Sequence, residues 1–158
     1  MSIIIDSGIF MNTSIISKFN QPIYTSPLVV EELKNQTTYN LFEVFKEQNN
    51  VTIMTPSQEL IDKITTQANQ LGQKELSKTD IEILALCLMF DNPLLITDDY
   101  DVKNVAHSLK IKSQGATTKG GSQLRKYKFK CIGCGKFYSN SIDECEICGT
   151  TKFNKFKK

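Results

Sequence analysis

Four of the chain's five cysteines form two Cys-x-x-Cys pairs with ten residues between the pairs. Thiolates at this spacing can hold one metal ion from a tight turn, and two such turns complete a tetrahedral four-thiolate site. The pattern predicts a Zn²⁺ site, with an iron–sulfur cluster as the main alternative. The predicted ligands are Cys131, Cys134, Cys145 and Cys148.

The segment around these cysteines is too short to fold on a hydrophobic core alone. A bound metal should therefore supply most of its folding free energy. Gly133, Gly135 and Gly149 stand beside the cysteines, where they permit left-handed turns that aim backbone N–H groups at sulfur. The fifth cysteine, Cys87, lies among leucines in a predicted helix and is expected to be a small buried hydrophobic residue.

A second group of candidate residues consists of carboxylates at the ends of predicted strands and helices. Asp6 follows three isoleucines, and Asp99 follows the apolar stretch LLIT and Asp98. Clustered carboxylates repel one another and are costly to desolvate, so they need a cation, and oxygen ligands suit Mg²⁺ or Mn²⁺. Such an ion can activate water and neutralise charge on a phosphodiester. The candidate catalytic and metal-binding residues are Asp6, Glu31 or Glu32, Asp80, and Asp98 or Asp99.

Each of these carboxylates also has a purely structural interpretation. Asp80 would complement a helix dipole, and Asp98 and Asp99 would be turn residues. Glu31 and Glu32 would be solvated side chains. Glu32 flanks the apolar stripe of its predicted helix, and the joint placement of four carboxylates at element ends favours the metal site.

The elements that must position these carboxylates alternate between short apolar strands and helices. This alternation predicts a parallel sheet covered by helices on both faces, with its site at the carboxyl ends of the strands. The predicted strands are residues 2–6, the stretch between Pro22 and Pro27, and residues 51–55, 94–97 and 111–113. The predicted helices are residues 26–35, 39–48, 57–73, 76–90 and 101–110.

Three of these helices carry local signals for their ends and their buried faces. Ser26 and Pro27 suit the N-cap and first position of helix 26–35. Gly72 marks the end of helix 57–73. In helix 76–90, Thr79 and Glu82 are expected to form a capping box. One buried face of that helix is expected from the spacing of Ile81, Leu84, Ala85, Leu88 and Met89.

Charge is divided unevenly along the 158 residues. Residues 1–118 hold nine lysines and fourteen acidic residues, whereas residues 119–158 hold ten basic and three acidic residues. The resulting net charges of −5 and +7 suggest one part that holds cations and another that holds a polyanion. No apolar run is long enough to span a membrane, and we expect no signal peptide in the first residues. We therefore expect a cytoplasmic protein whose thiols stay reduced.

The sequence predicts two domains joined by a linker. Residues 113–123 contain three glycines and no large apolar side chain, which is typical of a linker. The expected division is an α/β domain that carries the carboxylates over residues 1–115, a linker over 116–125, and a zinc ribbon with a basic tail over 126–158. If the ribbon holds an RNA, we expect the linker to let the larger domain reach the adjacent single-stranded part of that RNA.

Basic and aromatic residues are interleaved around the cysteines. Lysines meet phosphates and exposed aromatic rings stack on unpaired bases, so this pattern favours RNA binding. For Phe129, Phe137 and Phe153 the alternative, that they fill the small core of the ribbon, is favoured. The basic residues would otherwise form a solvated tail. The predicted RNA-binding residues are Arg125, Lys126, Lys128, Lys130 and Lys136.

Four stretches of the chain resemble the four acidic motifs of PIN-domain ribonucleases. They are IIIDSGIF, VVEELK, LSKTDIEILALCL and LLITDDYDVKNVA, and together they cover about residues 2–112. The resemblance implies a PIN-like fold and endonuclease activity on single-stranded RNA. It assigns the divalent metal to Asp6, Glu32, Asp80 and Asp99, and leaves Asp98 as an extra carboxylate of undefined role.

The order of a PIN-like domain, a glycine-rich linker and a four-cysteine ribbon resembles the Nin-one-binding family of archaea and eukaryotes. The knuckle CIGCGKFY and the stretches DYDVKNVA and CEICGT are especially similar. The resemblance implies an endoribonuclease that acts on the small ribosomal subunit precursor and cuts its rRNA to the mature 3′ end. The absence of insertions is typical of the archaeal type.

Three other functions remain open at the level of sequence. The chain would be a non-catalytic RNA-binding assembly factor if its carboxylates bound metal only weakly. A PIN-type toxin ribonuclease is disfavoured by the cysteine ribbon. A transcription-type zinc ribbon fused to an inert domain is disfavoured by the alignment of the carboxylates.

Overall fold

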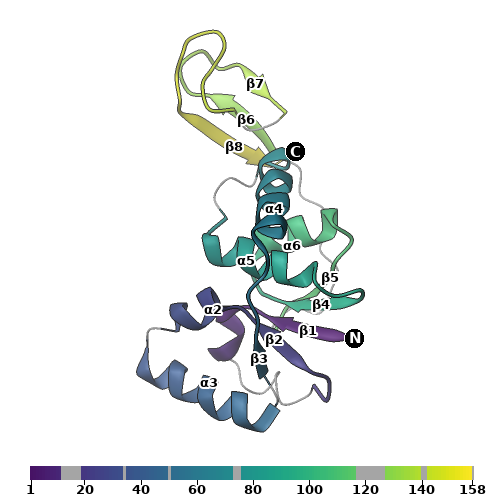
Figure 1. Ribbon diagram of the computed structural model, residues 1–158. Coiled ribbons are helices and arrows are strands. Elements are labelled where there is room, and N and C mark those ends of the chain that lie inside the picture. The colour runs from purple at the N-terminus through teal and green to yellow at the C-terminus, as the bar shows by residue number, and fades with distance from the viewer. Residues whose placement is uncertain are drawn as a thin grey trace.

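The computed structural model describes residues 1–11, 19–33, 35–49, 51–72, 76–116, 127–139 and 142–157. These residues form a five-stranded parallel sheet flanked by helices and a separate three-stranded antiparallel sheet. The small sheet projects beyond the end of helix α4 (Gln58–Gln70), whereas helix α3 (Gln36–Asn49) lies at the opposite end of the molecule (Figure 1). The predicted fold class is confirmed.

The large sheet has the strand order β3-β2-β1-β4-β5. The chain moves outward from β1 through β2 to β3, then crosses back to place β4 on the other side of β1. Ligands of such sheets bind where the strand order reverses, at the carboxyl ends of the strands. Here the reversal lies between β1 and β4. The strands are β1 (Ser2–Ile5), β2 (Ile23–Thr25), β3 (Val51–Ile53), β4 (Pro93–Ile96) and β5 (Lys112–Gln114).

Helices follow the strands much as the alternation predicts, with one addition. A short 3-10 helix directly after Asp6 was not predicted from the sequence, and it buries Ile9 and Phe10 completely. Ser26 caps the second helix by accepting from the Val29 N–H, and Pro27 is its first residue, as expected. Besides α3 and α4, the helices are η1 (Ser7–Met11), α2 (Pro27–Glu32), α5 (Lys78–Cys87) and α6 (Tyr100–Ser108).

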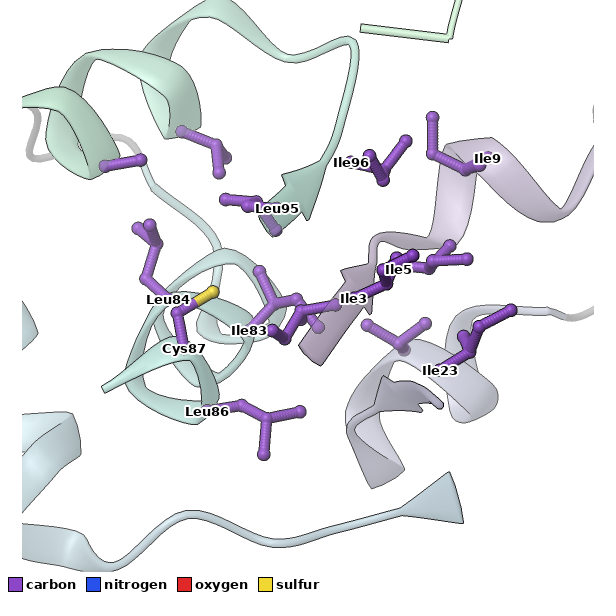
Figure 2. Close-up of a cluster of buried hydrophobic side chains, with 14 of the residues drawn as sticks. Ile3, Ile5, Ile9, Ile23, Ile83, Leu84, Leu86, Cys87, Leu95 and Ile96 are labelled. Atoms are coloured by element: carbon purple, nitrogen blue, oxygen red, sulfur yellow. The ribbon is translucent and has the colours of Figure 1, made fainter. Parts of the chain in front are cut away.

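Helix α5 is the most deeply buried of the helices that carry candidate site residues. The prediction of a single buried stripe is wrong in two respects. Ile83, Leu86 and Cys87 lie outside the predicted stripe but are fully buried, and Met89 lies within it but is 41% exposed. The reason is that α5 contacts β1 and β4 of the sheet and is flanked by α2, α4 and α6. Figure 2 shows its side chains against the isoleucines of β1 and the end of β4.

The capping residues of α5 also differ from the prediction. The N-cap is Ser77 rather than Thr79, and Asp80 completes the capping box that was expected of Glu82. Glu82 is instead 93% buried, with 7% of its surface exposed, and it accepts a hydrogen bond from the Leu28 N–H. A box beginning at Thr79 fails because the helix already starts at Lys78.

The small sheet consists of β6 (Tyr127–Cys131), β7 (Phe137–Tyr138) and β8 (Phe153–Lys157) in the order β7-β6-β8. Residues directly opposite one another in an antiparallel sheet share a face. The pairing places Lys128 opposite Phe156 and Lys130 between Phe137 and Asn154, which defines an outer face made of these five residues. The inner face holds Phe129, Cys131, Tyr138, Phe153 and Lys155.

This division of faces corrects the expected role of the ribbon's phenylalanines. Phe137 is 55% exposed on the outer face, so it does not fill a ribbon core. Phe129 is buried on the inner face, and Phe153 packs edge-on against Tyr138 with ring centroids 5.9 Å apart. Only the inner face of this three-stranded sheet is covered, and its outer face remains in solvent.

The glycine-rich stretch 113–123 begins within the large sheet, and the predicted linker 116–125 follows that sheet. Ser113 and Gln114 pair with Leu95 and Ile96, so the first two residues of the stretch 113–123 form part of strand β5. Most of the predicted linker, residues 117–125, lies outside the described residues. None of the helices in the described part of the chain has the length and apolar character needed to cross a membrane.

Candidate active site and metal centre

Asp6 lies at the strand-order reversal, directly after β1. It is only 8% exposed, and both of its carboxylate oxygens accept hydrogen bonds. The Thr97 hydroxyl donates to Oδ2 over 2.7 Å, and the Ser7 N–H donates to Oδ1 over 2.7 Å. Burial raises the pKa of Asp6, these hydrogen bonds lower it, and the charges of Asp99 and Glu32 raise it again, leaving a net increase.

Thr97 connects the two ends of the adjacent strands β1 and β4. Besides donating to Asp6, its hydroxyl oxygen accepts from the Asp99 N–H over 3.1 Å. Thr97 is fully buried, so this one hydroxyl fixes the position of Asp6 relative to the start of α6. The sequence showed a Thr-x-Asp pattern but gave no sign that the threonine would contact a residue 91 positions away.

Asp99 and Asp98 both have structural roles at the end of β4. Asp99 is the N-cap of α6, and its Oδ1 accepts from the Asp101 and Val102 N–H groups over 2.7 and 3.2 Å. Asp98 accepts from the Ala116 N–H over 2.9 Å and so holds the chain that follows β5. Both side chains are exposed.

Asp80 enters the site from α5. Its Oδ2 accepts from both the N–H and the hydroxyl of Ser77, each over 2.8 Å. Burial raises the pKa of Asp80, its hydrogen bonds to Ser77 lower it, and the charges of Asp6 and Asp99 raise it further. The contributions of Asp6 and Asp99 show that α5 brings this carboxylate into the field of the other two.

Glu32 ends helix α2 and is exposed, while its charge contributes to the raised pKa of Asp6. The position of α2 depends on Glu82, whose buried carboxylate accepts from the Leu28 N–H over 3.0 Å. Glu82 thereby joins the helix that carries Asp80 to the helix that carries Glu32. Sequence reasoning missed this role, because a glutamate two residues after Asp80 has no distinctive local pattern.

The four predicted carboxylates therefore share one electrostatic neighbourhood without closing into a compact cage. No three of them bring oxygen atoms within 4.8 Å of one another, a spacing that the four cysteine sulfurs do reach. Two physical causes favour this openness. Like charges repel, and Asp80 and Asp99 each direct an oxygen to a helix N-terminus.

The composition of this group fits a hard divalent cation. Among the ion pairs between described side chains, none involves Asp6, Glu32, Asp80 or Asp99. The negative charges are thus not neutralised by a neighbouring lysine or arginine in that part of the chain. Carboxylate oxygens without cationic partners are the ligands that Mg²⁺ and Mn²⁺ prefer. The catalytic and metal-binding assignment itself stays a prediction.

The four cysteines form a much tighter cluster. Their sulfurs all lie within 4.8 Å of one another, with Cys131 and Cys148 3.4 Å apart and Cys134 and Cys145 3.5 Å apart. Tetrahedral zinc with Zn–S bonds of about 2.3 Å separates its sulfurs by about 3.8 Å, so the cluster fits this ion. None of the four is in a disulfide.

Two kinds of glycine shape the knuckles. Gly135 and Gly149 have φ of 77° and 68°, and their N–H groups donate to the carbonyls of Cys131 and Cys145 over 3.0 and 2.8 Å. Gly133, predicted as a third left-handed turn, does not have a positive φ. It is needed for close approach instead, because a Cβ there would lie 2.9 Å from the Cys148 sulfur.

Tyr138 is an additional group at the cysteine cluster that sequence reasoning did not assign. Its Oη lies 3.1 Å from the Cys145 sulfur, and a thiolate can only accept, so the hydroxyl donates when Cys145 is ionised. This hydrogen bond is the main reason that the pKa of Cys145 is lowered to about 6. It stabilises the anionic form that binds metal.

The predicted RNA-binding residues divide between described and undescribed parts of the chain. Arg125 and Lys126 lie outside the described residues. Lys128 and Lys130 are on the outer face, where the Lys130 ammonium lies 5.5 Å from the centre of the Phe137 ring. Lys136 lies 5.2 Å from the centre of the Tyr138 ring and 3.7 Å from a Glu146 oxygen.

Comparison with known families places the larger domain. Residues 3–90 match the PIN domain of ribonuclease. This match spans the elements that carry Asp6, Glu32 and Asp80, and more than half of the 158 residues.

Individual relatives extend the similarity into the ribbon. Endoribonuclease Nob1 of Methanocaldococcus jannaschii is 34% identical over 137 residues, which cover 85% of this chain and 68% of that protein. Endoribonuclease Nob1 of Pyrococcus abyssi is 30% identical over 153 residues, covering 95% and 91% of the two chains. The 20S-pre-rRNA D-site endonuclease nob1 of Schizosaccharomyces pombe is 35% identical over 80 residues, covering 50% of this chain and 20% of that protein.

Proposed function

This chain belongs to the Nob1 family of PIN-domain endoribonucleases, and from that premise we propose that it cuts precursor small-subunit rRNA to form the mature 3′ end. It is an endoribonuclease with a role in ribosome biogenesis. The precursor and the cut position are suggested by the name of the fission yeast relative, a 20S-pre-rRNA D-site endonuclease.

The observation that carries the proposal is the set of carboxylates that share one electrostatic neighbourhood where the strand order reverses. Asp6 is buried at this point, and the charges of Asp99 and Glu32 raise its pKa. Burying a carboxylate among like charges is unfavourable unless a cation compensates it, so this arrangement is not explained by stability. A protein that only held RNA through its ribbon would have no need of it.

The chain's own residues have distinct roles in the proposed reaction. Asp6 is the central ligand, held by the Thr97 hydroxyl and the Ser7 N–H. Asp80 offers a carboxylate from the first turn of α5, Asp99 offers one from the N-cap of α6, and Glu32 offers one from the end of α2. When bound here, Mg²⁺ or Mn²⁺ would lower the pKa of a coordinated water and neutralise charge on the phosphodiester.

The outer face of the ribbon is the proposed RNA-contact surface. Its two lysines supply charge for phosphates, and its two aromatic rings, Phe137 and Phe156, are 55% and 45% exposed. Their centroids lie 6.2 Å apart at an angle of 57°, so each ring presents an accessible edge or face to an unpaired base. The precursor of the small ribosomal subunit is the proposed partner.

The decisive experiment maps the cut ends on a precursor RNA that spans the 3′ end of the small-subunit rRNA. Purified, zinc-loaded protein is incubated with the RNA and with Mn²⁺, Mg²⁺ or neither ion. We expect one dominant cut at the mature end that requires a divalent ion. Cleavage at many unrelated positions would leave a ribonuclease but remove the proposed substrate.

Asp6→Asn provides the matched variant for this assay, because it removes the central charge and preserves the shape of the side chain. Loss of cleavage with unchanged RNA binding supports the catalytic role of the carboxylates. Full cleavage by this variant would favour a contaminating nuclease and, for this chain, the non-catalytic assembly factor.

A further inference from the structure

The inner face of the ribbon contacts the nuclease domain at two points. Phe129 on β6 packs against Gly72, where an added Cβ would lie 2.5 Å from the ring's Cζ atom. Lys155 on β8 lies 3.9 Å from Asp101 in the first turn of α6. Figure 1 shows the ends of β6 and β8 beside the end of α4, where Gly72 follows the helix.

These two contacts are parts of one surface on the ribbon. Phe129 and Lys155 are directly opposite one another in the β6–β8 pairing, so their side chains share the inner face. Cys131 is two residues beyond Phe129 on the same strand and therefore also points to this side. Folding of the cysteine cluster thus fixes the orientation of the contact residues.

The burial of Phe129 shows that the contact is close. The ring is 7% exposed, although a sheet of this size offers little core of its own. Gly72 provides the space for it, since a residue with a Cβ would meet the ring. Gly72 also has φ of 72°, which ends α4 with a left-handed residue.

We propose that the ribbon is a docked module, held by its inner face on the end of α4 and the start of α6, rather than a separately moving one. This differs from the sequence expectation of a ribbon that positions the larger domain through a linker. Docking leaves the outer face, on the opposite side of the small sheet, open to a polyanion.

Docking has a consequence for the acidic site if the proposed function holds. The Asp101 N–H donates to Asp99 Oδ1 over 2.7 Å, so the ribbon contacts the same helix start that Asp99 caps. The distance from the outer face to the carboxylates would then be fixed. The docking itself is independent of cleavage and is tested without it.

The experiment compares the rotational tumbling of the two domains by ¹⁵N relaxation in the full-length, zinc-loaded chain. We expect one common correlation time for amides of the large sheet and of β6–β8. Gly72→Asn should give the ribbon a shorter correlation time, because asparagine tolerates the positive φ but places a Cβ against Phe129. Independent tumbling of the native chain, or common tumbling in the variant, would overturn the proposal.

A double-variant cycle separates the ring contact from any local effect at Gly72. In a Phe129→Ala background, Gly72→Asn should have no further effect on tumbling. Phe156→Ala, which removes an aromatic ring from the outer face, should leave the common tumbling unchanged. Loss of common tumbling in Phe156→Ala but not in Phe129→Ala would place the contact on the wrong face and refute the assignment.

The ion pair supplies a second, weaker test. Lys155→Glu should speed hydrogen exchange at the Gly72 amide by roughly twofold to fivefold, the range expected of a partly exposed pair. Adding Asp101→Lys should restore the native rate by reversing both charges. No effect of either single change, or no restoration in the double variant, would contradict this part of the interface.

Discussion

The two candidate metal-binding regions are built in opposite ways. The carboxylates are attached to a sheet and helices that have a large hydrophobic core, and they remain too far apart to form a compact cage. The cysteines are attached to three short strands with little core, yet their sulfurs converge within 4.8 Å. Where a hydrophobic core holds the candidate ligands in place, the fold tolerates repulsion among them. Where the ligands themselves hold the domain together, they must converge.

A common device nevertheless appears in both regions. A hydroxyl donates to an anionic candidate ligand in each, from Thr97 to Asp6 over 2.7 Å and from Tyr138 to Cys145 over 3.1 Å. The difference between the regions therefore lies in what holds the ligands together, and it can be tested.

The largest expected effect is the removal of zinc from the ribbon. A zinc-selective chelator, or Cys145→Ser, should unfold β6–β8, because structural zinc contributes about 10–16 kcal/mol of apparent binding free energy in small modules. The parallel sheet should stay folded, since its core contains no zinc ligand. Amide chemical shifts of both domains measure this directly. Cys87→Ala is the matched control and should leave the bound zinc in place.

Asp6→Asn should have the next largest effect and should separate activity from stability. We expect cleavage to fall on the order of 10²- to 10³-fold, as for other losses of a charge-stabilising group. The midpoint of thermal unfolding should rise at neutral pH without divalent ions, because a buried like charge is removed. Asp98→Asn, at an exposed carboxylate that accepts from the Ala116 N–H, should retain most cleavage. Equal losses in both variants would contradict the assignment.

Thr97→Val tests the hydroxyl in the nuclease domain. The change keeps the shape of the side chain but removes hydrogen bonds to Asp6 and Asp99, at a cost of about 1–3 kcal/mol for the unsatisfied buried group. Denaturant unfolding measures the loss. Thr97→Ser keeps the hydroxyl and should be close to native; a valine variant as stable as the serine variant would show that the hydroxyl does not contribute.

Tyr138→Phe tests the corresponding hydroxyl in the ribbon. Zinc affinity should fall about 10- to 100-fold, as for other partners of metal ligands, while the ring contact with Phe153 is retained. Competition with a chromophoric chelator measures the affinity. Tyr24→Phe, in the large sheet, should leave zinc affinity unchanged. Native affinity in Tyr138→Phe would show that the cysteines need no help from the hydroxyl.

The smallest expected effect is on the pH dependence of the nuclease domain without Mg²⁺ or Mn²⁺. Burial first, and neighbouring carboxylates after it, raise the pKa values of Asp6 and Asp80 above the ordinary value of 3.8. The contribution of these groups to stability is therefore full below pH 3.8 and declines as pH rises through the raised pKa values.

Thermal unfolding of zinc-loaded protein at a series of pH values, with and without Mn²⁺, measures this decline. We expect a fall of a few degrees that Mn²⁺ reverses. The Asp6→Asn variant should show a smaller decline than the native chain. An identical curve for both proteins would show that Asp6 is not a source of the pH dependence.

The sequence alone was sufficient for the parts of this protein that depend on local spacing. The two Cys-x-x-Cys pairs predicted a four-sulfur cluster, and the alternation of strands and helices predicted the fold class. Ser26 and Pro27 predicted the start of α2. In each case the information lies in nearby residues. It is contained either in the short spacing within one segment or in the periodic pattern of one buried surface.

Tertiary structure decided what depends on contacts between distant segments. The contact of Thr97 with Asp6 spans 91 residues, and that of Glu82 with Leu28 spans 54. The packing of Phe129 on Gly72 joins two domains across the segment predicted as a linker. A threonine, a glutamate or a phenylalanine has no local pattern that names its partner, because packing and hydrogen bonding depend on where the rest of the chain lies.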